Sequence, residues 1–435
     1  MRVVEISGPI TQDQIRTALP RASVSIERAL ETVIPLIEDI KTNSLAAVLE
    51  QAERFDGVRP EHIRVPRQIM NQALSELSAE LRAAIEVAIS RVRKVSVAGV
   101  PKDFQVELAQ GAVVSQRYVP VDSVGLYVPG GKAVYPSSVV MNAVAAQAAG
   151  VPRIAIASPA QKEFSGLPHP TILATAALLG VEEVYAIGGA AAVAAFGYGI
   201  KEIGLEPVRM VTGPGNIYVA AAKRALRGLI GIDSEAGPTE ILIIADQNAN
   251  PANIAADLIS QAEHDENAAA VLVTDSSELI AKVQIELEHQ VDKTHNRERV
   301  QKSLSGIQSA LVLVPDLGTA VAVSNEYATE HLEIQTSNPE ALVAEITNAG
   351  AIFVGDYSPV SLGDYLAGSN HVLPTGEQAK FGPGLGVHTF LRPQQIINYS
   401  KAALKQVVSQ LDTFARAEGL SAHGDAAKIR FHGGN

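Results

Sequence analysis

The chain has 435 residues, 47% of them hydrophobic, which at roughly 100–200 residues per domain suggests a globular protein of several domains. Its 35 Lys and Arg against 47 Asp and Glu give a formal net charge of -12, so neither nucleic acid nor an anionic membrane is the expected partner. The complete lack of cysteine excludes disulfides, thiolate zinc sites and a cysteine nucleophile, so an aldehyde could be oxidised only by base-assisted attack of water.

The first quarter of the chain has a helical pattern. From about 25 to 94, apolar residues recur at three- and four-residue spacing, as in Leu30, Val33 and Ile37. After Val121 the pattern changes to short apolar strands that alternate with Ala-rich helices. The expected elements are strands at 123–128, 153–158, 184–187 and 208–211, with a helix at 137–149.

A second series of alternating elements starts near Gly237. Strands are expected at 240–244, 270–274, 310–314, 332–335 and 351–354. Asn250-Pro251 supplies an N-cap and a first-turn proline for one helix, and Asn338-Pro339 opens another that Gly350 closes. Strands that alternate with helices indicate βαβ crossovers and parallel sheets. We therefore predict an α/β fold with two related open Rossmann-like domains.

The pattern changes again from Phe381. A Gly-rich loop at 382–386 leads to a long amphipathic helix at about 400–417 and a polar tail to Asn435. Such a helix has little to bury by itself, so it is expected to dock elsewhere, for example on a second subunit. The predicted division is an N-terminal segment 1–24, an α/β domain of 25–107 plus 238–379, a second α/β domain 108–237, and an extended helical tail 380–435.

No segment predicts a membrane span or a secretion signal. The longest weakly polar run, 186–200, is shorter than the roughly 20 apolar residues that a membrane helix needs. The first five residues, Met1-Arg-Val-Val-Glu5, show no uninterrupted apolar stretch of signal-peptide type. We therefore predict a cytoplasmic protein.

Histidines beside carboxylates or amides are the chemically distinctive residues. Gln261 and His264 are three apart near the end of a predicted helix, so both lie on one face and could share a metal ion. Glu330-His331 suits two proton-transfer tasks. The alternatives are a solvated helix end for the first pair, and a surface Glu with a capping His for the second. Asp364 and His423 are plausible further ligands.

Three glycine turns each follow a predicted strand and precede a predicted helix: Pro129-Gly-Gly131, Gly188-Gly189 and Gly213-Pro-Gly-Asn216. Backbone amides in such turns can bind a phosphate at a helix N-terminus. None completes the dinucleotide fingerprint, because Tyr218 stands where the third glycine would follow Gly213 and Gly215. The turns indicate either a nucleotide site or ordinary tight turns.

Taken together, these segments resemble the histidinol dehydrogenase family almost from end to end. The motifs that carry the resemblance are Tyr127-Val-Pro-Gly-Gly131, Tyr135-Pro-Ser-Ser138, Gly213-Pro-Gly-Asn-Ile-Tyr218, Ala236-Gly-Pro-Thr-Glu240, Gln261-Ala-Glu-His264, Glu330-His331-Leu332, Gly363-Asp-Tyr365, Asn370-His-Val-Leu-Pro374 and Val387-His-Thr-Phe390. Many motifs in matching order are far more specific than a shared fold.

The resemblance implies a homodimer with one Zn²⁺ per subunit that uses NAD to oxidise L-histidinol, through L-histidinaldehyde, to L-histidine, the last step of histidine biosynthesis. His331 is then the general base for the alcohol, and Glu330 activates water for the aldehyde. The implied zinc ligands are Gln261, His264, Asp364 and His423. The implied substrate site comprises Thr239, Gln261, His264, Glu330, His331, Asp364, His371, Glu418 and His423.

The resemblance also assigns roles to the predicted domains. Tyr127 and Asn216 contact NAD in domain 108–237, most of the zinc and catalytic residues lie in 25–107 plus 238–379, and the tail carries Glu418 and His423 to the partner's site. One position departs from the family, whose members typically have Gln where this chain has Ala191. The loss of about one hydrogen bond, about 0.5–1.5 kcal/mol, would weaken NAD binding.

Two other interpretations remain open at this point. A related zinc alcohol dehydrogenase could act on another small amino alcohol, but Glu418 and His423 suit recognition of histidinol. A non-catalytic α/β binding protein could share the fold, but the retention of Glu330, His331 and every expected zinc position argues against it.

Overall fold

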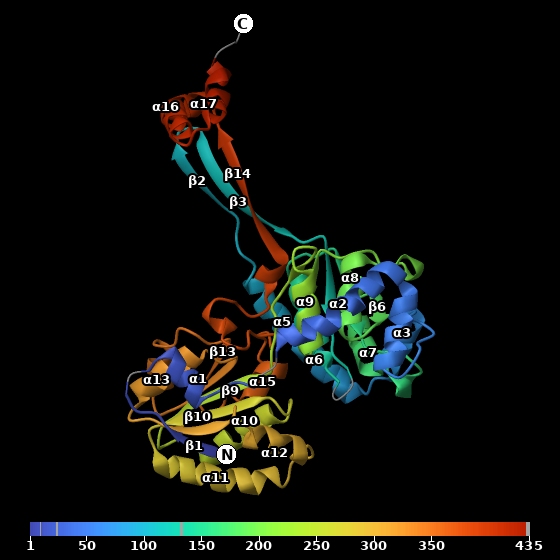
Figure 1. Cartoon of the computed structure of the whole chain (residues 1–435), viewed down its shortest axis with the longest axis vertical. Coiled ribbons are helices and arrows are strands. Elements are labelled where there is room, and N and C mark those ends of the chain that lie inside the picture. Colours follow the sequence, from blue (N-terminus) through green and yellow to red (C-terminus); the bar gives the residue numbers. More distant parts are fainter. Residues whose placement is uncertain (9, 23–24, 131–133, 432–435) are drawn as a thin grey trace. The chain divides into compact units, whose positions relative to one another are not determined.

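Two parallel sheets with helices around them form most of the protein in this computed structural model, which describes residues 1–8, 10–22, 25–130 and 134–431 (Figure 1). The predicted α/β class with two Rossmann-like domains is confirmed. Contacts divide the chain into a main unit, Met1–Gly99 with Asp122–Thr389, and a small unit, Val100–Val121 with Phe390–Asn435. No helix in the described ranges is long and apolar enough to cross a membrane.

The main unit begins with a strand and five helices and then alternates strands with helices. Its strands are β1 (Arg2–Glu5), β4 (Ser123–Tyr127), β5 (Arg153–Ser158), β6 (Glu183–Ala186), β7 (Met210–Thr212), β8 (Gly231–Ile232), β9 (Glu240–Ala245), β10 (Ala269–Thr274), β11 (Ala310–Leu313), β12 (His331–Gln335) and β13 (Ala351–Val354). Its 3-10 helices are η1 (Lys162–Phe164), η2 (Lys201–Ile203), η3 (Gln378–Lys380) and η4 (Val387–Phe390, whose last residue falls in the small unit).

The α-helices of the main unit cover both sheets. They are α1 (Gln12–Ala18), α2 (Ile26–Asn43), α3 (Leu45–Phe55), α4 (Arg67–Glu76), α5 (Ala79–Ala98), α6 (Pro136–Ala148), α7 (Pro170–Leu178), α8 (Gly189–Tyr198), α9 (Ile217–Leu226), α10 (Pro251–Ala262), α11 (Ser277–Val291), α12 (Arg297–Ser305), α13 (Leu317–Tyr327), α14 (Pro339–Val343) and α15 (Val360–Tyr365).

The first sheet has five parallel strands in the order β6-β5-β4-β7-β8. The chain moves from β4 through β5 to β6 on one side and returns to β7 on the other, so a topological switch point lies between β4 and β7. The crevice at the carboxyl ends of the strands beside a switch point is where open α/β sheets bind ligands.

The second sheet has six parallel strands in the order β1-β11-β10-β9-β12-β13. Alternating side chains of a strand point to opposite faces. Ile241 and Ile243 of β9 therefore join a core cluster with α10 and α11, whereas Leu332 and Ile334 of β12 join the cluster on the other face. The residues between them on β12, among them Glu333, consequently face α10.

The local signals for helix ends hold at most predicted positions. Asn250 caps α10 by accepting a hydrogen bond from the Ala252 amide, with Pro251 as the first helical residue, as predicted. Ser400 caps the predicted C-terminal helix in the same way through the Ala403 amide. One expectation was wrong, because the helix opened by Pro339 ends at Val343, well before Gly350.

The small unit consists of three antiparallel strands and two helices. Its elements are β2 (Phe104–Ala109), β3 (Ala112–Pro120), β14 (Leu391–Tyr399), α16 (Lys401–Ala417), α17 (Ser421–Lys428) and η5 (Ile429–Phe431). Helix α16 confirms the predicted helix at 400–417. The strands were not predicted, because β14 pairs with β3 from a distant part of the sequence.

The residue contacts that define the main and small units group the chain differently from the predicted domains. Val33 and Ile37 of α2 pack with Tyr185 in the core of the five-stranded sheet, so segment 25–107 does not follow 238–379 as a block. Residues 100–121 belong with the C-terminal segment in the small unit. The division of functional roles between the domains stays a prediction.

Candidate active site

Polar residues gather at the amino ends of β9 and β12, which are neighbours in the six-stranded sheet. Thr239 directly precedes β9, and Glu330 directly precedes β12. This placement is opposite to the usual location of ligands at the carboxyl ends of parallel strands. Seven of the predicted site residues lie in this region: Thr239, Gln261, His264, Glu330, His331, Asp364 and His371.

Glu330 is a buried carboxyl group with two hydrogen-bond donors. Its Oε2 accepts bonds from the Thr239 hydroxyl and from the Glu240 amide, the latter at 3.0 Å. Burial raises the pKa of Glu330 to about 8, although the two donors act in the opposite direction. A carboxyl group with this pKa can exchange a proton near neutral pH, which suits acid–base catalysis.

His331 is held in one orientation as the first residue of β12. Its Nδ1 lies 3.1 Å from the Glu240 carbonyl oxygen. Because a carbonyl oxygen only accepts, Nδ1 carries the proton, and Nε2 keeps its lone pair. Burial lowers the pKa of His331, which favours this neutral form. His331 is therefore prepared to receive a proton at Nε2.

The amide of Gln261 is oriented by a chain of hydrogen bonds. The Thr239 hydroxyl donates to the Glu330 carboxyl group, so it must accept from elsewhere, and Gln261 Nε2 donates to it at 2.7 Å. The Gln261 Oε1 atom then points away from Thr239. It is buried and has no hydrogen-bond partner among the described residues. A buried acceptor of this kind normally has a partner, which makes it a candidate metal ligand.

His264 and Asp364 lie beside Gln261 on two adjacent helical elements. His264 follows the C-terminal end of α10, three residues after Gln261, and Asp364 lies in α15, which packs on α10. His264 Nε2 is 3.8 Å from Asp364 Oδ2. Burial alone would lower the pKa of His264, but the Asp364 carboxylate raises it overall. The same pairing holds the pKa of Asp364 below its usual value despite burial.

The three side chains fit a zinc ion with nitrogen and oxygen ligands. Gln261 offers an unpaired amide oxygen, His264 an imidazole nitrogen and Asp364 a carboxylate oxygen, all donor types found at zinc. Within the described parts of the chain no three His, Asp or Glu side chains gather as a metal-binding group. These three side chains of the main unit are one amide and two stronger ligands, one fewer than the four ligands of a typical site.

His371 connects this region to the five-stranded sheet. Its Nδ1 is 3.0 Å from the Asp364 carbonyl oxygen and therefore carries a proton, so its Nε2 accepts from the Ser138 hydroxyl at 3.2 Å. The neighbouring Asn370 donates to the Met141 carbonyl at 2.8 Å. Ser138 and Met141 both belong to α6, the first helix after β4, so this helix contacts the loop that carries His371.

A cavity of about 600 Å³ opens beside the metal-type ligands. His264 and Asp364 line it together with Tyr135, and the apolar side chains of Leu81 and Ile85 from α5 form another part of its wall. The cavity combines polar groups that could fix a substrate with an apolar surface, as small-molecule sites usually do.

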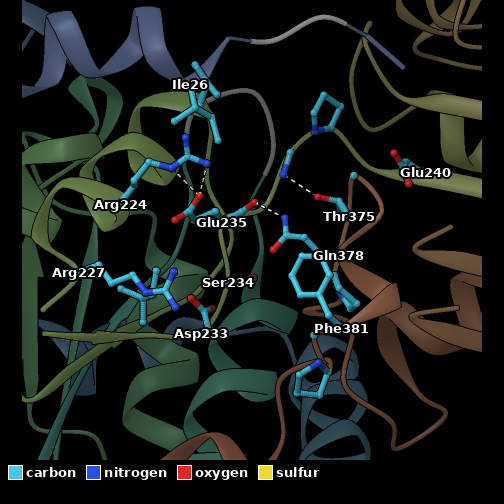
Figure 2. A pocket seen from close by; sticks show the side chains of 18 of the residues that line it. Ile26, Arg224, Arg227, Asp233, Ser234, Glu235, Glu240, Thr375, Gln378 and Phe381 are labelled. Carbon is cyan, nitrogen blue, oxygen red and sulfur yellow. Dashed lines mark hydrogen bonds and ion pairs between the residues drawn. The ribbon is translucent and has the colours of Figure 1, made fainter. Parts of the chain in front are cut away.

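A larger cavity of about 1310 Å³ lies along the segment that joins the two sheets (Figure 2). That segment is held from both sides, because Arg224 pairs with Glu235, and Gln378 Nε2 donates to the Glu235 carbonyl at 2.8 Å. The Gly237 amide also donates to Thr375 at 2.6 Å. The lining of this cavity includes none of the predicted site residues.

The predicted NAD residues lie at the switch point of the five-stranded sheet. Tyr127 ends β4, and its hydroxyl accepts a bond from the Gly189 amide at 3.1 Å. Asn216 caps α9, and its Oδ1 accepts from the amides of Tyr218 and Val219. The turn before α9 requires glycine at Gly213, where φ is 114° and a Cβ would lie 2.1 Å from the Tyr127 carbonyl oxygen.

The remaining predicted residues are not among those gathered at the amino ends of β9 and β12. Gly131 of the first glycine turn lies outside the described residues. Glu418 follows α16 and His423 lies in α17, and both are exposed residues of the small unit. Ala191 is buried in α8.

The sequence analysis missed polar residues both in the site and next to it. Ser138 was quoted only within a motif, and nothing in the sequence links it to His371, 233 residues away. Glu333 and Gln335 follow His331 at two-residue spacing in a strand that is otherwise apolar. This spacing was a readable signal, because it places all three side chains on one face of β12.

The fold is that of an α/β protein with glycine turns at the switch point of one sheet and a buried imidazole, a buried carboxyl group and a Gln–His–Asp group at the other, and the comparisons place it in the class of dehydrogenases. A model of the histidinol dehydrogenase family matches residues 19–431. The chain therefore belongs to the histidinol dehydrogenase family of NAD-dependent oxidoreductases, which use zinc and act in histidine biosynthesis.

Individual members of the family are similar to this chain over nearly its full length. The chain is 56% identical to the histidinol dehydrogenase of Leifsonia xyli, with 99% of both chains covered. It is 52% identical to that of Corynebacterium glutamicum, over 99% of this chain and 98% of the relative. The crystal structure of histidinol dehydrogenase from Elizabethkingia anophelis is 31% identical and superposes with a TM-score of 0.93, covering 99% of this chain and 98% of the other.

Proposed function

We propose that this protein oxidises L-histidinol to L-histidine in two NAD-dependent steps, through L-histidinaldehyde, as the final step of histidine biosynthesis. The observation that carries the proposal is the hydrogen-bonded chain from Gln261 through Thr239 to Glu330, next to His331. This arrangement supports the proposal because it combines an amide oxygen without a hydrogen-bond partner among the described residues, a carboxyl group of raised pKa and an oriented imidazole.

Gln261, His264 and Asp364 would hold the zinc ion. Bound there, zinc would supply a Lewis-acidic anchor for the imidazole and amine of the substrate, and thus orientation rather than the nucleophile. The residues themselves prepare this arrangement, because Thr239 fixes the Gln261 amide and because α15 holds Asp364 next to His264.

His331 is the general base for the alcohol in this proposal. Its Nε2 lone pair takes the hydroxyl proton while the carbinol C–H bond breaks and its electron pair leaves as hydride. The Glu240 carbonyl accepts from Nδ1 and therefore stabilises the imidazolium that forms. The lowered pKa of His331 keeps the base form available at neutral pH.

Glu330 is the base for the second oxidation. Its carboxylate removes a proton from water while the water oxygen bonds to the aldehyde carbon, and the His331 imidazolium formed in the first step returns its proton to the carbonyl oxygen, which gives the hydrate. Loss of a second hydride from that carbon, with a hydroxyl proton passing to a base, then gives the acid. A chain without cysteine needs such a water-activating group, since no thiol is available to form a thiohemiacetal.

Tyr127 and Asn216 would contact NAD, which supplies the hydride acceptor. Support comes from their position at the carboxyl ends of β4 and β7, where the Gly213 turn leaves the backbone free for close approach. Asn216 also sits at the N-terminus of α9, which favours a pyrophosphate nearby.

We further propose a homodimer in which Glu418 and His423 complete the partner's site. Two features support it. The three proposed ligands of the main unit are one short of the usual four of a zinc site, and the small unit exposes large apolar side chains, such as Leu108 at 62%, Ile397 at 71% and Phe414 at 72%. Exposed apolar surface of this kind marks an association surface.

The test is the amount of NADH formed per L-histidinol consumed by zinc-loaded protein. Two per substrate is expected. One per substrate, with free aldehyde accumulating, would remove the proposed role of Glu330, and none would contradict the proposed substrate.

A further inference from the structure

A second polar cluster lies one helical turn deeper than the site, in a position that neither step of the reaction uses. It consists of Asp257 of α10 and of Glu333 and Gln335 of β12, which are 8%, 1% and 3% exposed. Gln335 Nε2 donates to Asp257 Oδ2 at 3.2 Å and to Glu333 Oε2 at 2.9 Å. Burial of a polar group without hydrogen-bond partners costs free energy, so a polar cluster in an apolar core indicates a structural or functional role.

The cluster contacts the same three elements as the site does. Glu333 lies two residues beyond His331 on the same face of β12. Asp257 lies four residues before Gln261, on the same face of α10. Glu333 Oε1 accepts a bond of 2.8 Å from the amide of Val360, the first residue of α15 and four residues before Asp364.

This bond replaces a missing helix cap. The N-cap of α15 is Pro359, whose side chain has no acceptor, and the first amides of a helix lack partners within the helix. Glu333 supplies the acceptor from the neighbouring strand. It thus ties the beginning of α15 to β12, while Gln335 and Asp257 tie β12 to α10.

The two carboxyl groups behave as one unit. Burial raises the pKa of Asp257, and burial together with repulsion from Asp257 raises the pKa of Glu333 further. A proton shared between them would remove that repulsion. The hydrogen bonds described above, rather than this titration, define its geometry.

We propose that Glu333 is a positioning residue: by holding α15 against β12 and, through Gln335 and Asp257, against α10, it sets the spacing between Asp364 and the Gln261–His264 pair. This inference rests on the proposed zinc site. Groups that support metal ligands in this way typically change metal affinity about 10–100-fold when they are removed.

The test compares zinc affinity, measured by competition with a chromophoric chelator, for metal-free wild type, Glu333→Leu and Glu333→Gln. Glu333→Leu keeps the volume but loses the acceptor, so its zinc affinity should fall at least about 10-fold and the KM for L-histidinol should rise. Glu333→Gln keeps an acceptor for the Val360 amide, so it should bind zinc within a few-fold of wild type.

A matched control separates positioning from general stability. Val323→Ala truncates a fully buried side chain in the core cluster on the other face of the sheet. It should lower the melting temperature and leave zinc affinity unchanged. The inference about Glu333 would be overturned if a folded Glu333→Leu protein bound zinc as tightly as the wild type, or if Val323→Ala lost as much zinc affinity as Glu333→Leu. Neither result would affect the proposed zinc site. Absence of zinc binding by the wild type would overturn the proposed zinc site as well.

Discussion

Thr239 determines which atom of Gln261 faces the site, since its hydroxyl donates to Glu330 and accepts from the Gln261 amide nitrogen. The same hydroxyl therefore connects the proposed metal ligand Gln261 to the proposed catalytic carboxyl group of Glu330. Glu240 acts similarly through its backbone, because its amide bonds Glu330 and its carbonyl orients His331. In the proposed mechanism a different residue serves each half-reaction, so mutation should affect the two half-reactions separately.

Glu330→Gln should impair oxidation of L-histidinaldehyde much more than oxidation of L-histidinol, because the amide cannot remove a proton from water. His331→Asn should show the opposite preference, because it removes the base for the alcohol. A loss of about 10²–10⁴-fold in the affected half-reaction is expected for removal of a general base. Single-turnover NADH formation from each substrate measures both. Equal losses in both half-reactions of Glu330→Gln would contradict this division.

Aldehyde oxidation should depend on pH through Glu330. Burial raises the pKa of this carboxyl group to about 8, so the base form is scarce below that pH and predominates above it. The rate with L-histidinaldehyde should therefore increase as pH rises through about 8 and then level off. Alcohol oxidation should already be near its maximum there, because burial lowers the pKa of His331. A flat aldehyde profile in the wild type would exclude this assignment.

Ala191 offers a test on the cofactor side. It is a small buried residue of α8, in the helix that follows the Gly188-Gly189 turn. Ala191→Gln would restore the amide typical of the family and should lower the dissociation constant for NAD by about 2–10-fold, corresponding to about one hydrogen bond. Isothermal titration calorimetry with NAD measures the dissociation constant. No change would show that the substitution does not limit cofactor binding.

At the scale of elements, local sequence signals predicted α10 well and the antiparallel strands poorly. Asn250-Pro251 and the apolar spacing define α10, and the same helix places Gln261 and His264 together. By contrast, β3 and β14 pair residue by residue from Leu391 with Pro120 to Tyr399 with Ala112. No local signal contains that long-range register, so the predicted tail lacked its strand.

Helix α6 shows why part of the site escaped prediction. It belongs by sequence to the five-stranded sheet, yet Ser138 donates to His371 and the Met141 carbonyl accepts from Asn370. These contacts depend on how the two sheets of the main unit pack, which residue spacing does not encode. Helix α6 is therefore expected to link cofactor binding to substrate binding.

Ser138→Ala removes the donor to His371 Nε2 and should raise the KM for L-histidinol by about 3–10-fold, the effect of about one lost hydrogen bond, with a smaller change in kcat. Steady-state kinetics at saturating NAD measures the changes in KM and kcat separately. Ser303→Ala is a matched control, since it also deletes a buried, hydrogen-bonded hydroxyl but in α12. An unchanged KM in Ser138→Ala would mean that the bond to His371 does not position the substrate.

At the scale of the whole molecule, the proposed dimer predicts that His423 reaches the site from the partner chain. The residue lies in the small unit, whose exposed apolar side chains support association, whereas Gln261, His264 and Asp364 lie in the main unit. If two chains share each site, two inactive variants should complement each other. His331→Asn inactivates a site through its main unit, and His423→Ala inactivates one through its small unit.

A dimer with one subunit of each kind would contain one fully wild-type site, built from the main unit of the His423→Ala chain and the small unit of the His331→Asn chain. Co-expression in equal amounts should therefore restore about one quarter of wild-type activity, because about half of the dimers are mixed and each has one intact site of two. Tagged copies purified as mixed dimers should show about half. Mixed dimers without activity would instead place His423 in the site of its own chain, since that arrangement leaves every site with one defect.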